Sequence, residues 1–150
     1  MSTAPAFGTE LIGRTEKALN AILDQQLRGT DLTEPQWVAL TIAVVSGGTI
    51  DRATLVRRAA GALKTSDTDA QARIDELVTA GLLEAPDGDD ALAAVTDTGR
   101  QFHRRVRAGV AEITERLWGD LPDDELAVAG RVLGTVLERA NELLAQVSGR

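Results

Sequence analysis

The stretch GLLEAPDGDDALAAVTDTG, residues 81–99, decides which fold the sequence predicts. Gly81 ends a helical pattern, and two short apolar runs, LLEA and ALAAV, flank the segment PDGDD. Apolar runs separated by Pro, Asp and Gly are typical of a β-hairpin, although alanine-rich strands are weak by propensity. The segment TDTG then has the capping residues of a new helix. We therefore expect a hairpin between two helices.

Four helices are predicted before this hairpin, because hydrophobic residues recur there at helical spacing. The segments are residues 10–28, 31–45 with Thr33 as the cap, 51–63, and a fourth that runs from a cap at Ser66 or Asp67 to about residue 80. Gly29 and the segment SGG, residues 46–48, separate the first three. The fold class is therefore mainly α with one small hairpin.

Two long helices are predicted after the hairpin, over about residues 97–118 and 122–147. The last helix repeats Leu, Val and Ala at helical spacing and would be roughly 40 Å long. A chain this small cannot bury so long an apolar face within its own domain. We expect a homodimer built from the terminal helices, and the alternative is an intramolecular bundle.

The length of 150 residues is that of a single domain, and 43% hydrophobic residues suffice for a core. The chain has no cysteine, which excludes disulfides and zinc–thiolate sites. The beginning, MSTAPAFGTELIG, is unlike a secretory signal, and the longest apolar stretch, WVALTIAVV, is too short to cross a bilayer. These features predict a cytoplasmic protein without a membrane segment.

Negative charge is concentrated in one part of the chain. The net charge is −7, which argues against indiscriminate binding to polyanions. Residues 74–99 contain seven carboxylates and no Lys or Arg. Five of these acids belong to the hairpin region: Glu84, Asp87, Asp89, Asp90 and Asp97. The acidity is therefore local and centred on the hairpin.

Four segments resemble the MarR family of winged-helix transcription regulators, in the family's order and spacing. LTEPQWVAL looks like its Leu-Thr-x-x-Gln-Trp-x-x-Leu helix, and ATLVRRA lies where the helix-turn-helix begins. ARIDELVTAGLLE is similar to the end of its recognition helix, and AAVTDTGRQF resembles the segment that closes the wing. The likeness spans about residues 10–147.

The resemblance implies one domain over residues 1–150, with dimerisation helices at 10–30 and 100–147 and a winged helix-turn-helix at 33–99. It implies a homodimeric regulator that binds double-stranded DNA and responds to a small hydrophobic effector. The chain departs from the family where Arg usually occurs. Glu84-Ala85 follows Gly-Leu-Leu, and the hairpin tip has Asp89 or Asp90 in place of an Arg.

Candidate DNA-binding residues lie on the two helices before the hairpin. Base edges would be read by Thr65, Ser66, Thr68, Gln71 and Arg73, and phosphates would be bound by Arg57, Arg58 and Lys64. The alternative for the two arginines is that they are ordinary solvated residues. If the acidic hairpin abolishes DNA binding, the chain would instead be a winged-helix module that binds a basic protein partner.

Other candidate sites have simpler alternatives. PDGDD offers oxygen ligands for a cation but lacks EF-hand spacing, so we expect a polar turn and no metal. The basic cluster RQFHRRVR, residues 100–107, either contacts an anion or pairs with the hairpin acids. His103 is the only histidine, so no catalytic pair or metal cluster is indicated, and we expect neither an enzyme nor a cofactor. The family's effector pocket would correspond to Leu19, Trp37, Leu40, Phe102 and Val106, which could equally be core.

Overall fold

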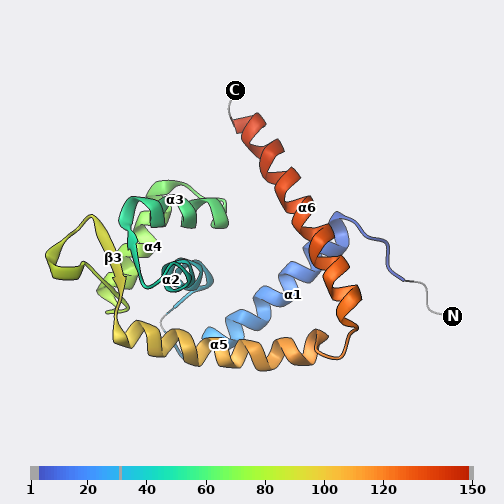
Figure 1. Ribbon diagram of the computed structural model, residues 1–150, viewed down its shortest axis with the longest axis horizontal. Helices are drawn as coiled ribbons and strands as arrows, with labels where there is room; N and C mark the ends of the chain where they lie inside the picture. The colour runs from blue at the N-terminus through green and yellow to red at the C-terminus, as the bar shows by residue number, and fades with distance from the viewer. Residues whose placement is uncertain (1–3, 31, 149–150) are drawn as a thin grey trace. The chain divides into compact units, whose positions relative to one another are not determined.

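The computed structural model describes residues 4–30 and 32–148, and in this part of the chain it is mostly helical (Figure 1). The elements are α1 (Thr9–Leu27), α2 (Glu34–Val45), β1 (Thr49–Asp51), α3 (Arg52–Leu63), α4 (Asp67–Thr79), β2 (Leu83–Glu84), the 3-10 turn η1 (Pro86–Gly88), β3 (Leu92–Val95), α5 (Asp97–Trp118) and α6 (Asp123–Ser148). The described residues up to Val110 form one compact unit, and those from Ala111 form a second. The six predicted helices are confirmed.

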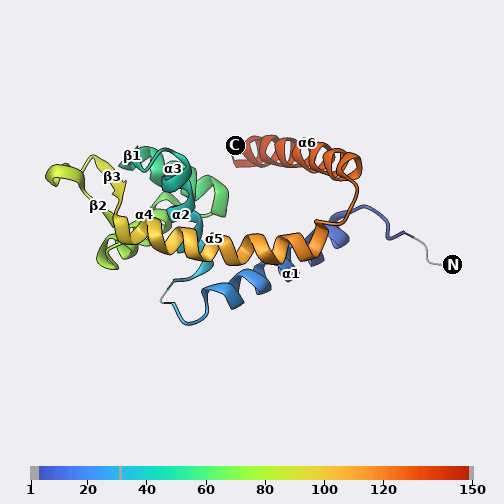
Figure 2. The ribbon, with the colours of Figure 1, turned by 60° about the horizontal axis from the view of Figure 1, so that its bottom comes forward.

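The first unit is built on three helices, α2, α3 and α4, which all pack against one another (Figure 2). Each contributes aliphatic side chains at helical spacing to a shared core. Its largest fully buried members are Leu40, Leu55, Ile74, Leu77 and Leu83. Aromatic residues are few, and both Trp37 and Phe102 belong to this core. The core therefore fixes α3 and α4 relative to each other.

The hairpin is confirmed, but it belongs to a three-stranded antiparallel sheet of order β1-β3-β2. β3 pairs with β2, where Leu83 lies opposite Val95, and with β1, where Ile50 lies opposite Ala93. The sequence pattern did not predict β1. This strand has only three residues, too few for an alternating pattern, and its partner is more than forty residues away in the chain.

Side-chain caps begin the helices where the sequence predicted them. Thr33 and Gln36 form a capping box at α2, and Ser66 accepts a hydrogen bond from the backbone of Asp69 at α4. Thr96 accepts from the backbone of Gly99 at 2.9 Å and donates to the carbonyl oxygen of Gly81 at 2.7 Å. Thr96 therefore joins the start of α5 to the end of the α4 segment.

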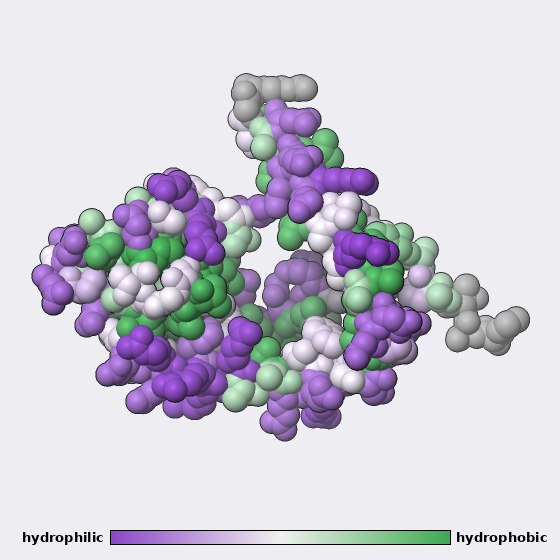
Figure 3. All heavy atoms as spheres, viewed as in Figure 1, coloured by the Kyte–Doolittle hydropathy of each residue, from purple (hydrophilic) through white to green (hydrophobic). Residues whose placement is uncertain are grey.

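The second unit consists of the end of α5, a turn and α6. No residue of α6 is buried, although the helix has 26 residues and carries a stripe of leucine and valine. Leu137 is 59% exposed and Leu144 is 48% exposed. Hydrophobic side chains accordingly reach the surface along this helix (Figure 3). No helix within residues 4–30 and 32–148 is both long and apolar enough to cross a membrane.

We predict opposite effects for alanine at two glycines. A Cβ at Gly99 would collide with the carbonyl oxygen of Leu82 and lie 3.1 Å from Cγ1 of Val95, whereas a Cβ at Gly61 on α3 would meet open space. Gly99→Ala should lower the free energy of unfolding by roughly 1–3 kcal/mol through overpacking. Gly61→Ala should raise it by about 1 kcal/mol, because alanine favours the helix. Urea unfolding followed by circular dichroism measures both, and two changes of the same sign would contradict the close packing at Gly99.

Candidate nucleic-acid interface

α3 and α4 are joined by a tight turn whose geometry is fixed by local hydrogen bonds. Lys64 adopts the left-handed conformation, with φ 57° and ψ 46°, and ends α3. The backbone N–H of Thr65 then donates to the carbonyl oxygen of Ala60 at 3.0 Å, and Ser66 caps α4. The two helices pack closely across this turn. The result is a helix-turn-helix in which α4 is the second helix.

An open hollow of about 490 Å³ lies beside α4. It is lined by Val56 of α3 and by Asp67, Thr68, Gln71, Ala72 and Asp75 of α4. Thr68 and Gln71 are predicted base-reading residues, so the structure places two of that set in one depression. Two carboxylates lie there with them. The hollow therefore combines hydrogen-bonding side chains with carboxylates, and no Lys or Arg among the described residues lines it.

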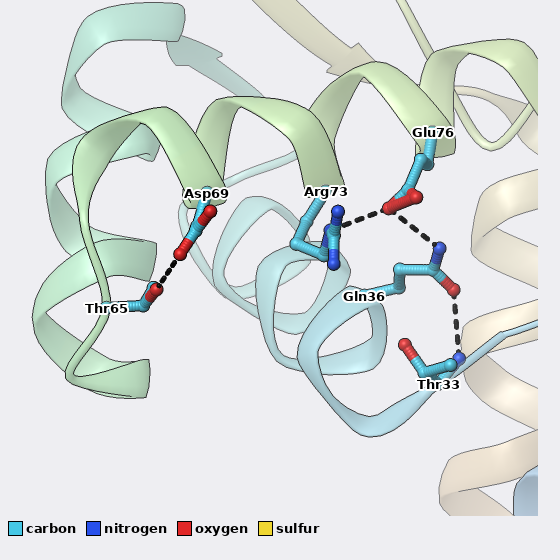
Figure 4. Close-up of polar contacts among 6 residues, drawn as sticks. All are labelled: Thr33, Gln36, Thr65, Asp69, Arg73 and Glu76. Carbon is cyan, nitrogen blue, oxygen red and sulfur yellow. Dashed lines mark hydrogen bonds and ion pairs between the residues drawn. The ribbon is translucent and has the colours of Figure 1, made fainter.

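Arg73, another predicted base reader, is held on the side of α4 that faces α2 (Figure 4). Its Nε lies 2.6 Å from Oε1 of Glu76, and its side chain is 37% exposed. The Nε–H is buried and does not point at a hydrogen-bond acceptor, so this contact is an ion pair rather than a directed hydrogen bond. The positive charge of Arg73 is therefore already countered within the protein.

Glu76 also connects α4 to the cap of α2. Its Oε1 accepts a hydrogen bond from Nε2 of Gln36 at 3.1 Å, and Oε1 of Gln36 accepts from the backbone N–H of Thr33 at 2.9 Å (Figure 4). The same figure shows Thr65, which donates to Asp69 at 2.9 Å one turn earlier on α4. Glu76, Gln36, Thr33, Thr65 and Asp69 are thus hydrogen-bonded within the protein, whereas the Nε–H of Arg73 has only its ion pair with Glu76.

The predicted phosphate-binding arginines are exposed on α3. Arg57 donates to the hydroxyl of Thr54 at 3.2 Å, and Arg58 donates to the hydroxyl of Ser46 at 2.7 Å. Both partners are neutral, so neither contact removes the charge of its guanidinium. The hydrogen bonds of Arg57 and Arg58 therefore do not neutralise their positive charges, whereas the charge of Arg73 is countered by Glu76.

The hairpin presents its carboxylates to solvent. Glu84, Asp87, Asp89 and Asp90 are all exposed, and Asp89 accepts a hydrogen bond from the backbone of Ala91 at 3.0 Å, as expected for a polar turn. Within the described ranges, no group of three or more His, Cys, Asp or Glu could hold a metal ion. In the basic cluster after the hairpin, Arg100 pairs with Asp97 at 3.0 Å. That contact agrees with the charge-pairing interpretation of the cluster.

The predicted effector residues are mostly core residues. Trp37, Leu40, Phe102 and Val106 are buried, whereas Leu19 on α1 is 36% exposed. The rings of Trp37 and Phe102 meet edge to face, with centroids 6.5 Å apart. Packing in the core is sufficient to explain why the four buried residues are apolar. The same packing brings the two aromatic rings into contact.

His103, for which the sequence pattern indicated no site, lies in the same aromatic group. Its ring stacks on Trp37 with centroids 4.6 Å apart, and its Nε2 lies 3.2 Å from the hydroxyl of Thr41. It is 5% exposed. Burial and, secondly, the charge of Arg107 lower the pKa of His103 below its ordinary value of 6.5. The neutral ring is therefore part of the folded core.

Several residues that shape the candidate interface were not indicated as site residues by the sequence. Arg52 donates to Asp75 at 2.6 Å, and Gln36 reaches Glu76 across 40 positions in the chain. Helical spacing does give a signal for the local pairs, because Gln71 and Asp75 are four residues apart and Arg73 and Glu76 are three. The long-range partners depend on the packing of different helices and have no such signal.

No family model matches the sequence, and no curated protein matches it. Solved structures do match. A MarR-family regulator from Silicibacter pomeroyi has a TM-score of 0.75 at 20% identity, covering 90% of this chain and 90% of that one. CouR from Rhodococcus jostii RHA1, bound to p-coumaroyl-CoA, has a TM-score of 0.71 at 19% identity, covering 84% of this chain and 88% of that one.

A third match is the Mycobacterium tuberculosis MarR-family protein Rv2887 in complex with salicylic acid. Its TM-score is 0.58 at 24% identity, covering 84% of this chain and 94% of that one. At these identities the likeness shows the fold. The chain has the winged helix-turn-helix fold of the MarR-family regulators, as its sequence motifs suggested.

We predict that acid destabilises the protein through His103. Because its pKa is lowered in the folded state, the unfolded chain binds this proton more readily. The contribution of His103 to stability should be complete above about pH 6.5 and should decrease as the pH falls below that value. The free energy of unfolding should therefore drop between about pH 8 and pH 5.5, as measured in urea.

His103→Gln is the control, because glutamine can still bond with Thr41 but does not titrate. The variant should lose less stability than the wild type over the same interval. Glu34 acts in the other direction: burial and then Glu16 and Asp24 raise its pKa above 4.5, so its effect opposes that of His103 and is common to both proteins. Equal losses in the two proteins would contradict the prediction.

Proposed function

We propose that the protein is a transcription regulator of the MarR type, which binds double-stranded DNA as a cytoplasmic homodimer under the control of a small-molecule effector. The observation that carries this proposal is the helix-turn-helix of α3 and α4, set beside a three-stranded sheet in the arrangement shared with the MarR-family structures. In such modules the second helix enters the major groove. Here that helix is α4.

The proposed DNA contacts follow from where the side chains lie. Thr68 and Gln71 are the base readers, because both line the hollow beside α4. Thr65 and Ser66, the other proposed base readers, lie at the beginning of α4, where Thr65 donates to Asp69 and Ser66 caps the helix. Phosphates would be bound by Arg57, Arg58 and Lys64. Arg73 can contribute only if DNA displaces it from Glu76.

The proposed dimer follows from α6. A helix of 26 residues with an apolar stripe and no buried residue gains its stability by packing that stripe against another surface. A second copy offers the same stripe, which suits a two-fold interface. Dimerisation would hold two α4 helices about one turn of DNA apart, roughly 34 Å.

The proposed effector is a small aromatic compound. CouR binds p-coumaroyl-CoA and Rv2887 binds salicylic acid, and both ligands carry an aromatic ring. In this chain the corresponding site would involve Leu19, Trp37, Leu40, Phe102 and Val106. Trp37 and Phe102 already meet edge to face, so an aromatic ligand would extend an existing aromatic cluster.

A second candidate function rests on the acidic hairpin. Its four exposed carboxylates repel phosphate and would attract a basic protein surface. In this alternative the winged helix is an interaction module that does not bind DNA. Under the leading proposal, the hairpin stays clear of the DNA backbone and only α3 and α4 make contact.

We predict that a charge on the apolar stripe of α6 prevents dimerisation. Leu144→Glu should shift the particle from about twice the 15.9 kDa chain mass to the mass of one chain, because burying an unpaired carboxylate is costly. Light scattering at micromolar concentration measures the change. Gln146→Glu is the control, since it puts the same charge on the opposite side of the helix and should leave the dimer intact. A wild-type monomer would contradict the dimer proposal.

We predict binding to duplex DNA with a steep salt dependence that Arg57 and Arg58 cause in part. Each phosphate contact contributes about 0.9 to the slope of log K against log salt, so Arg57→Ala/Arg58→Ala should flatten it by up to roughly 2 in each protomer. Fluorescence anisotropy with genomic duplexes at several salt concentrations measures this slope. Arg14→Ala/Lys17→Ala, which removes two exposed cations from α1, should leave it unchanged.

The result of this DNA-binding measurement separates the two candidate functions. A wild-type protein that binds no duplex at low salt would rule out the DNA-binding proposal. Retention on a basic peptide surface, lost when Asp87, Asp89 and Asp90 are changed to Asn, would then favour the interaction module. DNA binding that those three changes leave unaltered or strengthen would support the leading proposal.

A further inference from the structure

Asp75 holds two side chains with a single oxygen atom. Its Oδ1 accepts a hydrogen bond from a terminal nitrogen of Arg52 at 2.6 Å and another from Nε2 of Gln71 at 2.8 Å. Arg52 begins α3, while Gln71 and Asp75 are one turn apart on α4. This group of three residues therefore links the two helices on the side of the hollow.

Arg52 is the fixed end of this group. Its side chain is only 22% exposed, compared with 59% for Asp75. Its backbone N–H donates to the carbonyl oxygen of Ala91 at 2.8 Å, which ties the start of α3 to the strand segment leading into β3. The guanidinium also offsets the negative charge of Asp75. Asp75 is thus held by a residue that is itself anchored to the sheet.

The carboxylate determines which way the amide of Gln71 is turned. An ionised carboxylate only accepts hydrogen bonds, so the nitrogen of the amide must face Asp75 and the oxygen must face away. One of the two N–H groups is used in this bond. The second N–H and the carbonyl oxygen Oε1 remain for a ligand in the hollow that Gln71 lines.

These two free groups match one base. In the major groove adenine presents N7 as an acceptor and the N6 amino group as a donor, and a glutamine amide pairs with both. We propose that Arg52 and Asp75 are positioning residues that hold Gln71 in the orientation that reads adenine. This proposal rests on the proposed DNA-binding function and identifies the base that α4 prefers.

The carboxylate of Asp75 has two opposite effects on binding. It lies on the face of α4 that would approach DNA, where a negative charge weakens attraction to phosphates. It also restricts the Gln71 amide to one orientation, which lowers the conformational cost of forming two hydrogen bonds at once. Removing it should therefore strengthen general binding and weaken discrimination, a combination that loss of structure does not produce.

The test is selection from a pool of duplexes with randomised sequence, followed by affinity measurements on the selected site and on single-base variants. The wild type should select adenine at one position in each half-site. Gln71→Ala should lose that preference. Asp75→Ala should reduce the discrimination at this position by roughly tenfold, the size of one good base contact, while binding random duplex more tightly.

Asp67→Ala is the matched control. Asp67 lines the same hollow and carries the same charge, but the Gln71 amide donates to Asp75 rather than to it. The control should bind random duplex more tightly and keep the adenine preference. Asp75→Leu has a side chain of similar size without an acceptor and serves if Asp75→Ala does not fold. The double variant Gln71→Ala/Asp75→Ala should discriminate no less than Gln71→Ala alone.

Three outcomes would overturn the proposal. An unchanged adenine preference in a folded Asp75 variant would overturn it and leave the proposed function standing. A wild-type preference for cytosine that Asp75→Ala abolishes and Gln71→Ala retains would show that Asp75 itself reads a base. Failure of the wild type to bind any duplex at low salt would overturn this proposal together with the proposed function.

Discussion

The arrangement of this protein depends on one small aliphatic core, in which Leu40 of α2, Leu55 of α3 and Ile74 of α4 are completely buried. Burial of these side chains holds three short helices at fixed angles, which none of them could maintain alone. The sheet closes the core on another side through Leu83 and Val95. This packing also fixes which side chains of α4 reach the surface. Because one face of the helix is buried in the core, the opposite face must be exposed.

How far the sequence predicts the molecule depends on the range of the interaction involved. Helices follow from local periodicity and local caps, so residues such as Thr33, Ser66 and Gly81 indicated their ends correctly. β1 was not predicted, because three residues show no period and their pairing with β3 is long-range. The same holds for the site. Spacing brings Gln71 near Asp75, but the contact between Arg52 and Asp75 exists only because α3 packs on α4.

The charges on α3 and α4 differ in how far they are neutralised within the protein. On α4, Arg73 is paired with Glu76, and Asp75 is offset by Arg52, so this helix has little net attraction for phosphate. On α3, Arg57 and Arg58 are bonded to neutral hydroxyls and keep their charge available. General attraction would thus come from α3, and base discrimination from hydrogen-bonding groups on α4. Such a division lowers non-specific binding, which depends almost entirely on cations, more than it lowers specific binding.

The apolar stripe of the long helix α6 bears on both the stability of this helix and its proposed role in dimerisation. With no buried residue, α6 has little to hold it as an isolated helix, so partner binding and folding of this segment would be coupled. A dimer that forms by covering the stripe would therefore depend on protein concentration, and so would the pairing of two α4 helices on DNA.

A single helix that hydrogen-bonds one base in a hollow carries little specificity. Two such helices at a fixed separation multiply their discrimination, since each base contact contributes its own factor. The exposed apolar stripe of α6 and the few base-reading groups of α4 thus have one explanation. A second protomer would bury the stripe and would add the base contacts of a second α4.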